Sequence, residues 1–215
     1  MILLAFATQI EAQPFIDYHR LTRQNTSSLY AVYGGNNISL IITGMGALKG
    51  ALYLSEILQQ RELTGHPVTE VINYGVAGCV CDTFSLGEIV VVDKAIKYDP
   101  VEFSKPQPNK HFSSSFPDFT LTLKKKDITV LATSDHPIFT EDDAHCVAQH
   151  AHLVDMEGYG YAFAANSHGI PLQLVKGISD FAYKKSEQSF KKIMGHVLKE
   201  LLSFHRTRAA IKEGK

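Results

Sequence analysis

The sequence has 215 residues, and its 21 lysines and arginines against 22 aspartates and glutamates give a net charge of −1. This length favours one domain with a substantial core, and the absence of a basic stripe argues against nucleic acid as a partner. No apolar run approaches the ~18 residues of a membrane span, and residues 1–7 lack the basic segment of a signal peptide. We therefore predict a cytoplasmic domain that contacts neither a membrane nor nucleic acid.

The cysteines do not suggest a metal centre or a disulfide framework. Cys79 and Cys81 are separated by one residue, not the two or more usual between zinc ligands, and Cys146 is distant in the sequence. An odd number of cysteines also argues against a closed disulfide framework. We therefore expect no metal and no other cofactor, and interpret the cysteines as small buried residues.

The first half of the chain alternates apolar runs with glycine-rich turns. Residues 2–7 predict a strand buried on both faces, followed by a helix or turn that contains Glu11. The apolar runs 29–33 and 38–43 flank Gly-Gly-Asn-Asn, which predicts a β-hairpin. An amphipathic helix is expected from Leu48 to about Arg61. Residues 71–74 predict a short strand that ends in the glycine-rich turn 75–78, and residues 88–92 predict a further strand.

The second half begins with a long loop, 99–119, in which prolines and serines alternate with phenylalanines. Loops of this length are usually functional lids or disordered. A strand at 128–132 and a helix with Thr140 as its N-cap follow. Residues 153–180 predict a short apolar segment, a helix rich in small residues, a Gly-Ile-Pro turn and an apolar strand. An amphipathic helix is expected from Ser186 to His205, and a fraying polar tail at 206–215.

This alternation of strands and helices predicts one α/β domain, residues 1–205, in which helices cover both faces of a central twisted mixed sheet. In such proteins ligands bind outside the carboxyl ends of the strands. Glu157 opens the helix of the 153–180 segment and Asp180 closes its strand, so we expect both side chains to face one small molecule. Glu11 follows the first strand, so it is also expected near the carboxyl end of a strand.

Each of these features also has a purely structural interpretation. On position alone, Glu11 is better explained as a solvated carboxylate in the first turn of a helix. Taken singly, Glu157 could equally well open a helix and Asp180 could equally well cap the segment after its strand. Gly44 and Gly46 could bring backbone N–H groups to an anion, but they lack the third glycine of a dinucleotide fingerprint and a Walker lysine.

The motifs occur in a recognisable order: Glu11 after the first strand, Thr43-Gly-Met-Gly46, Asn73-Tyr-Gly-Val-Ala-Gly78, Val154-Asp-Met-Glu157 and Lys176-Gly-Ile-Ser-Asp180. Together they resemble the nucleoside phosphorylase/nucleosidase superfamily, most closely the methylthioadenosine/S-adenosylhomocysteine nucleosidases and their futalosine-cleaving relatives. The resemblance runs from residue 1 to about residue 202. It implies the three-layer nucleoside phosphorylase-like fold, a homodimer, and hydrolysis of the N-ribosidic bond of a 5′-substituted adenosine with release of adenine.

The resemblance also implies roles for individual residues. Glu11 matches the carboxylate that activates the attacking water, and Asp180 matches the acid that protonates N7 of the leaving purine, with Ser179 holding its carboxyl group. Met156 and Glu157 match the pair that meets the ribose. The other residues that the resemblance places around the base, the sugar or the 5′ substituent are Val76, Gly78, Phe103, Ile138, Phe139 and Phe190.

Departures from the family pattern bear on the nucleophile and the substrate. Asn73 and Val76 stand where the phosphorylases carry an arginine and a serine that hold phosphate, which favours water as the nucleophile. Lys176 replaces an arginine of the nucleosidases, and we expect it to pair with Glu11 and keep that carboxylate ionised. Asp180 is the residue expected for an adenine leaving group. Methylthioadenosine, S-adenosylhomocysteine and aminodeoxyfutalosine, the last from the alternative menaquinone route, are therefore the candidate substrates.

Other functions remain open at this point. The Gly75-Val-Ala-Gly78 turn is closer to the futalosine hydrolases, which release hypoxanthine. A phosphate-dependent phosphorylase with an anion site at Gly44-Met-Gly46, or a non-catalytic nucleoside-binding module, would also account for part of the pattern.

Overall fold

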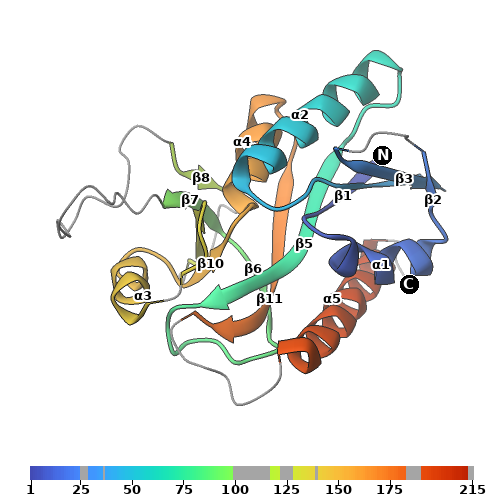
Figure 1. The fold of residues 1–215 in the computed structure, drawn as a ribbon. Helices are drawn as coiled ribbons and strands as arrows, with labels where there is room; N and C mark the ends of the chain where they lie inside the picture. The colour runs from blue at the N-terminus through green and yellow to red at the C-terminus, as the bar shows by residue number, and fades with distance from the viewer. Residues whose placement is uncertain are drawn as a thin grey trace.

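The computed structural model of the protein describes residues 1–24, 29–35, 37–98, 117–121, 128–138, 140–182 and 190–212. In these ranges the strands form one mixed sheet with helices on both of its faces (Figure 1). The predicted three-layer α/β architecture is therefore confirmed. No helix in the described ranges is long and apolar enough to cross a membrane.

Two long parallel strands, β5 (Glu70–Cys79) and β11 (Leu172–Phe181), form the centre of the sheet. On one side of β5 lies β1 (Ile2–Phe6), which pairs in parallel with β5 and with β4 (Ile38–Ile42). The predicted hairpin is confirmed, because β3 (Ala31–Gly35) runs antiparallel to β4. Leu3 to Phe6 are completely buried, as expected for a strand covered on both faces.

Four short strands extend the sheet beyond the carboxyl end of β5. The strand β10 (Leu153–Asp155) pairs with this end, and β9 (Val130–Ser134), β7 (Lys94–Tyr98) and β8 (Phe119–Thr120) follow in that order. The strand β2 (Thr22–Arg23) pairs with β3 at the opposite edge, and β6 (Ile89–Val91) pairs with β11.

The helices bury two separate apolar clusters against the sheet. α2 (Ala47–Leu63) and α4 (Gly158–Ser167) pack together over one face, and α1 (Gln9–His19) and α5 (Phe190–Lys212) cover the other (Figure 1). α3 (Glu141–Ala148) packs against the outer strands and begins with Thr140, whose side chain accepts a hydrogen bond from Asp143 N, as predicted. These layers leave the carboxyl ends of the central strands for a ligand site.

The prediction of a short strand that ends at residue 74 is wrong. β5 continues to Cys79, so Gly75 and Gly78 lie within an extended strand, not in a turn. Neighbouring side chains crowd the space that a Cβ would occupy at these two glycines. A Cβ on Gly75 would lie 3.2 Å from Glu11 Oε1 and 3.3 Å from Lys176 Nζ. A sequence reading that treats glycine as a turn signal cannot anticipate this crowding.

The last helix also differs from expectation. α5 continues to Lys212, so the polar residues 206–212 belong to the helix, not to a fraying tail. Arg208 fixes this end: its guanidinium pairs with Glu70, the first residue of β5, and its Nε donates to Gln173 of β11 at 3.1 Å. These contacts to strands compensate for the lack of an apolar pattern in the last turns.

The small residues of α4 allow it to approach α2 closely. A Cβ on Gly160 would lie only 2.1 Å from the carbonyl oxygen of Ala47, a backbone atom that cannot move aside. Replacing Gly160 by alanine is therefore expected to lower the free energy of unfolding by about 3 kcal/mol. Denaturant unfolding followed by circular dichroism measures this change.

Gly195 provides the matched control for that substitution. It lies in α5, is exposed, and a Cβ there would meet no atom within 4 Å. Gly195→Ala is expected to stabilise the protein by about 0.5–1 kcal/mol, because alanine has the higher helix propensity. Equal effects of the two substitutions would contradict the close helix approach.

Candidate active site

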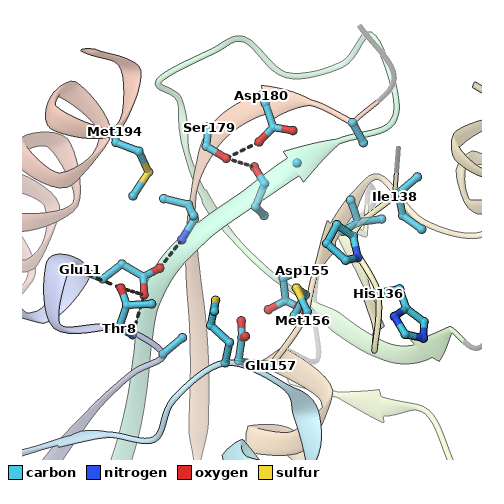
Figure 2. A pocket seen from close by; sticks show the side chains of 18 of the residues that line it. Thr8, Glu11, His136, Ile138, Asp155, Met156, Glu157, Ser179, Asp180 and Met194 are labelled. Atoms are coloured by element: carbon cyan, nitrogen blue, oxygen red, sulfur yellow. Dashed lines mark hydrogen bonds between the residues drawn. The ribbon is translucent and has the colours of Figure 1, made fainter. Parts of the chain in front are cut away.

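A cavity of about 730 Å³ opens at the carboxyl ends of β1, β5 and β11, beside the end of β10 (Figure 2). The first turn of α1 and the turn before α2 also contribute to its wall, as does Met194 of α5. This is where an α/β protein is expected to bind a small molecule. Glu157 and Asp180, which we expect to face one small molecule, both line this cavity.

The cavity brings together residues from several distant motifs. Predicted site residues that line it are Glu11, Val76, Gly78, Ile138, Met156, Glu157, Ser179 and Asp180. Phe103, Phe139 and the side chain of Phe190 lie outside the described residues. Lys176 does not line the cavity, because its side chain is only 1% exposed and lies behind the wall.

Glu11 is held in place by hydrogen bonds to both of its carboxylate oxygens. Oε2 accepts from Thr8 N at 3.0 Å and Thr8 Oγ1 at 2.8 Å, and Oε1 accepts from Val76 N at 3.2 Å (Figure 2). The Val76 contact crosses from the first turn of α1 to β5, so it fixes the orientation of Glu11 toward the cavity.

The interpretation of Glu11 as a solvated first-turn carboxylate is wrong. The residue does belong to the first turn of α1 and forms a capping box with Thr8. However, Glu11 is only 5% exposed. One side chain therefore caps the helix and presents a buried carboxylate to the cavity.

Ser179 and Asp180 lie at an irregularity in β11. The pairing with β5 shifts between Ile178 and Asp180, which indicates a β-bulge that turns both Ser179 and Asp180 toward the cavity. Ser179 Oγ lies 2.5 Å from Asp180 Oδ1 and 3.3 Å from the carbonyl oxygen of Ala77. Gly78 leaves room for this group, because a Cβ there would lie 3.3 Å from Asp180 Oδ2.

Glu157 immediately precedes α4 and is buried in the cavity wall. Its Oε1 accepts a hydrogen bond of 2.8 Å from Gly46 N. Burial, and after it the negative charge of Asp155, raise the pKa of Glu157 to about 7, although Lys176 and the Gly46 N–H oppose the shift. Glu157 therefore changes charge near neutral pH.

The Gly44-Met45-Gly46 turn binds an anion that belongs to the protein itself. Gly46 has a φ of 108°, a conformation that favours glycine, and this directs its N–H to the Glu157 carboxylate. The phosphorylase alternative placed phosphate at this turn. Because Gly46 N already donates to Glu157, the turn does not offer that N–H to a phosphate.

The expected pairing of Lys176 with Glu11 is not what the structure shows. Lys176 Nζ forms an ion pair of 2.8 Å with Asp155 Oδ2, and both side chains are 1% exposed. Asp155 also accepts from Thr133 Oγ1 at 2.6 Å and from Gly158 N at 2.8 Å. This set of donors neutralises a charge that would otherwise be costly to bury.

Sequence reasoning missed several lining residues: Thr8, Met45, His136, Asp155 and Met194. The spacing of Thr8 and Glu11 is that of a capping box, which was a readable signal. Asp155 adjoins Met156 and could have been included with that motif. Met45, His136 and Met194 come from a turn, a loop and a helix, and no local pattern distinguishes them.

The cavity wall is poor in positive charge. Among the described residues that line it there is no lysine or arginine, and His136 is the sole basic side chain. In the same described ranges, His, Cys, Asp and Glu side chains nowhere gather in threes as they would to hold a metal ion. The polar chemistry of the described wall therefore rests mainly on carboxyl and hydroxyl groups and on backbone N–H groups.

A mixed sheet between two helical layers, with an acidic cavity at the strand ends, defines the class of three-layer α/β proteins that bind small molecules. The model of the phosphorylase superfamily matches residues 3–210. The chain therefore belongs to the phosphorylase superfamily. No curated protein sequence matches it significantly.

Solved structures show the same fold. A Helicobacter pylori nucleosidase mutant with 5′-methylthioadenosine in its active site superposes with a TM-score of 0.74 at 17% identity, covering 96% of this chain and 98% of that one. The Streptococcus pneumoniae 5′-methylthioadenosine/S-adenosylhomocysteine nucleosidase gives 0.71 at 20%, with 94% and 96% covered. The futalosine hydrolase of H. pylori gives 0.73 at 18%, with 94% and 95% covered.

Proposed function

We propose that this protein is a purine nucleosidase, which hydrolyses the N-ribosidic bond of 5′-substituted adenosines and releases adenine. The observation that carries the proposal is the presence of two carboxyl groups in contrasting settings on one cavity wall. Glu11 receives three hydrogen-bond donors, whereas Asp180 lies beside a single hydroxyl group. Two carboxyl groups in different surroundings are suited to opposite roles in acid–base chemistry.

Cleavage of an N-ribosidic bond places two demands on such a site. Positive charge develops on the sugar, as in glycoside hydrolysis, and the purine departs more easily when it is protonated. Asp180 is the proposed acid for N7 of the base, and Glu11 is the proposed base that orients and deprotonates the attacking water. Figure 2 shows the two groups on separate parts of the cavity wall, which leaves space for a nucleoside between them.

The surroundings of Ser179 support the acid role of Asp180. The hydroxyl lies within hydrogen-bond distance of both Asp180 Oδ1 and the Ala77 carbonyl oxygen, but it has one hydrogen. Both contacts are satisfied together when Asp180 carries a proton and donates it to Ser179, which then donates to Ala77. After proton transfer to the base, Ser179 can turn its hydrogen to the Asp180 carboxylate. Ser179 thus stabilises both states.

Met156 and Glu157 are the proposed ribose contacts. Glu157 Oε1 is occupied by Gly46 N, which leaves the second carboxylate oxygen for the sugar hydroxyl groups. Met156 lines the cavity next to it and provides an apolar surface against the sugar. Val76, Gly78 and Ile138 complete the proposed binding surface around the nucleoside.

Water is favoured over phosphate as the nucleophile by the charge of the wall. Phosphate carries two negative charges and needs cationic or N–H donors, but the described lining residues include neither lysine nor arginine. Lys176 already forms an ion pair with Asp155, and Gly46 N already donates a hydrogen bond to Glu157. Glu11 at the same place would repel phosphate but would orient water.

A product assay over a small nucleoside panel tests the proposal. Methylthioadenosine, S-adenosylhomocysteine, aminodeoxyfutalosine and futalosine should be compared with and without phosphate. Release of adenine and a free reducing sugar without phosphate is the expected result. A strict need for phosphate, with ribose 1-phosphate as product, would identify a phosphorylase. Tight adenine binding without turnover of any nucleoside would identify a binding module, and preferential release of hypoxanthine a futalosine hydrolase.

The charge of Glu157 should control the pH dependence of substrate binding. Because burial raises its pKa to about 7, the carboxylate that accepts the ribose hydroxyl bonds is protonated increasingly as the pH falls. We expect kcat/KM to decline below pH ~7, approaching tenfold per pH unit. Steady-state kinetics between pH 5 and pH 9 measure this decline. The Glu157→Gln variant should have low activity that no longer declines below pH ~7. If the variant shows the same decline, Glu157 is not its cause.

We further propose that the protein acts as a homodimer. Met45, in the turn before α2, is 62% exposed, and Leu48 and Leu52 of α2 are 80% and 55% exposed, so these residues form an apolar stripe at the start of the helix. Met45 also lines the cavity, so a second subunit packed on this stripe would close the site at that edge. Light scattering at micromolar concentration should give the mass of two chains.

A cytoplasmic location stays a prediction from the sequence.

A further inference from the structure

Two thiol groups lie next to each other at the end of β5, behind the cavity wall. Cys79 Sγ and Cys81 Sγ are 3.6 Å apart, and both cysteines are unbridged. A disulfide bond has a sulfur–sulfur distance of about 2.05 Å, so closure requires the two sulfurs to approach by only about 1.5 Å. Val80 is the single residue between them.

The two cysteines differ in accessibility. Cys79 is completely buried in the core, whereas Cys81 is partly exposed. Burial raises the pKa of the Cys79 thiol to about 11, so this thiol is a poor nucleophile toward a reagent in solution. Cys81 is therefore placed to meet an oxidant first, and Cys79 is placed to react with it afterwards.

We propose that Cys79 and Cys81 form a reversible disulfide bond and thereby make a redox modification site beside the cavity. In the first step the Cys81 thiolate attacks a small disulfide such as oxidised glutathione, which forms a mixed disulfide and releases one glutathione thiolate. In the second step Cys79 ionises and attacks the Cys81 sulfur, which releases the second glutathione, and the protons of the two cysteines end on the two glutathione thiolates. Two protein thiols are thus oxidised by two electrons while one glutathione disulfide is reduced to two thiols.

Closure of this bond reaches the cavity through backbone hydrogen bonds. The carbonyl oxygen of Cys79 accepts from Ala182 N at 3.0 Å, and Cys79 lies opposite Phe181 in the sheet. Phe181 and Ala182 line the cavity directly after Asp180, and Gly78, which precedes Cys79, lines it as well. A shift of Cys79 therefore moves the wall on both sides of Asp180.

The residue between the two cysteines is anchored, so closure must be taken up by movement of Cys79 or Cys81. Val80 is 4% exposed, and its N–H donates to the carbonyl oxygen of His152 at 3.0 Å. In the reduced form the Cys79 thiol donates to the carbonyl oxygen of Cys81 at 3.0 Å. Oxidation removes this hydrogen, so the hydrogen bond to the Cys81 carbonyl oxygen is lost when the two sulfurs bond. The reduced form is thus held by a local contact that the disulfide abolishes.

Thiol mapping of the full chain tests the proposal. The reduced protein is incubated with excess oxidised glutathione, alkylated, digested and analysed by mass spectrometry. The expected result is a Cys79–Cys81 disulfide with Cys146 still alkylated or glutathionylated, and the same disulfide in Cys146→Ser. Peroxide is avoided because methionines line the cavity. Alkylation of both Cys79 and Cys81 at equilibrium, or bridging through Cys146, would overturn the proposal.

Single variants separate the two steps. Cys79→Ser and Cys79→Ala should accumulate a stable glutathione adduct on Cys81, whereas Cys81→Ser should leave Cys79 unmodified in the folded protein. Ring closure in the wild-type protein should accelerate about tenfold per pH unit between pH 7 and pH 9, because Cys79 must ionise. A closure rate that does not change with pH would contradict the assigned order.

The effect on the cavity has a readout independent of any enzymatic activity. Hydrogen exchange of peptides covering 76–82 and 178–182 should differ between the oxidised and reduced protein and return on addition of dithiothreitol. Identical exchange would show that the bond does not reach the cavity. Nucleoside turnover is also expected to fall reversibly on oxidation, and this measurement alone rests on the proposed function. If the disulfide maps as expected but the reduced protein turns over no nucleoside, the proposed function fails and the modification site stands.

Discussion

Asp180→Asn is expected to lower kcat for adenine release by about 100- to 10,000-fold. Asparagine preserves the shape of the side chain and the contact with Ser179 Oγ, but it has no carboxyl proton to transfer to N7 of the base. Substrate binding should change much less than turnover, because the loss falls on the transition state. Steady-state kinetics on the best nucleoside of the panel measure both quantities.

An activated substrate distinguishes acid catalysis from a general loss of activity. The leaving group of 4-nitrophenyl riboside departs without prior protonation, so Asp180→Asn should cleave it nearly as well as the wild-type protein does. Asp142→Asn, an exposed substitution in the first turn of α3, serves as the control for the loss of one carboxyl group. Near-normal adenine release by Asp180→Asn would remove its role as the acid.

Glu11→Gln is expected to lower turnover of both substrates by about 100-fold or more, because the attacking water is needed whichever group leaves. The amide cannot accept a proton from water. It also places an N–H group among the donors of Thr8 and Val76 that now surround the carboxylate. The loss of one such hydrogen bond should cost about 1 kcal/mol of stability, which thermal unfolding measures separately.

Thr8→Ala separates the role of Glu11 and Thr8 in capping α1 from the proposed role of Glu11 in activating water. It removes the N-cap of α1 and one donor to Glu11 but leaves the carboxylate in place. The stability loss should be about 0.5–2 kcal/mol, with a far smaller effect on turnover than Glu11→Gln has. If the two variants lose turnover to the same extent, Glu11 acts by holding the helix and not by activating water.

The contrast between Glu11 and Lys176 shows where sequence reasoning succeeds and where it stops. The position of Glu11 after a buried strand was sufficient to place it at the carboxyl edge of the sheet. The pairing of Lys176 with Glu11 is expected only because Lys176 stands where the nucleosidases that the sequence resembles carry an arginine. In the structure Lys176 forms an ion pair with Asp155 instead, because the end of β10 places that carboxylate 2.8 Å from the ammonium group.

The sequence by itself determined the alternation of strands and helices, the α/β class, and the motifs that supply Glu11, Glu157, Ser179 and Asp180. These features are local, because hydrophobic periodicity and short motifs depend on neighbouring residues. Tertiary structure decided the extension of β5 through its glycines, the use of the Gly46 N–H by Glu157, and the contributions of Met45, His136 and Met194 to the cavity. These features depend on which atoms of distant segments compete for the same space and the same hydrogen bonds, and this is settled only when the layers pack together.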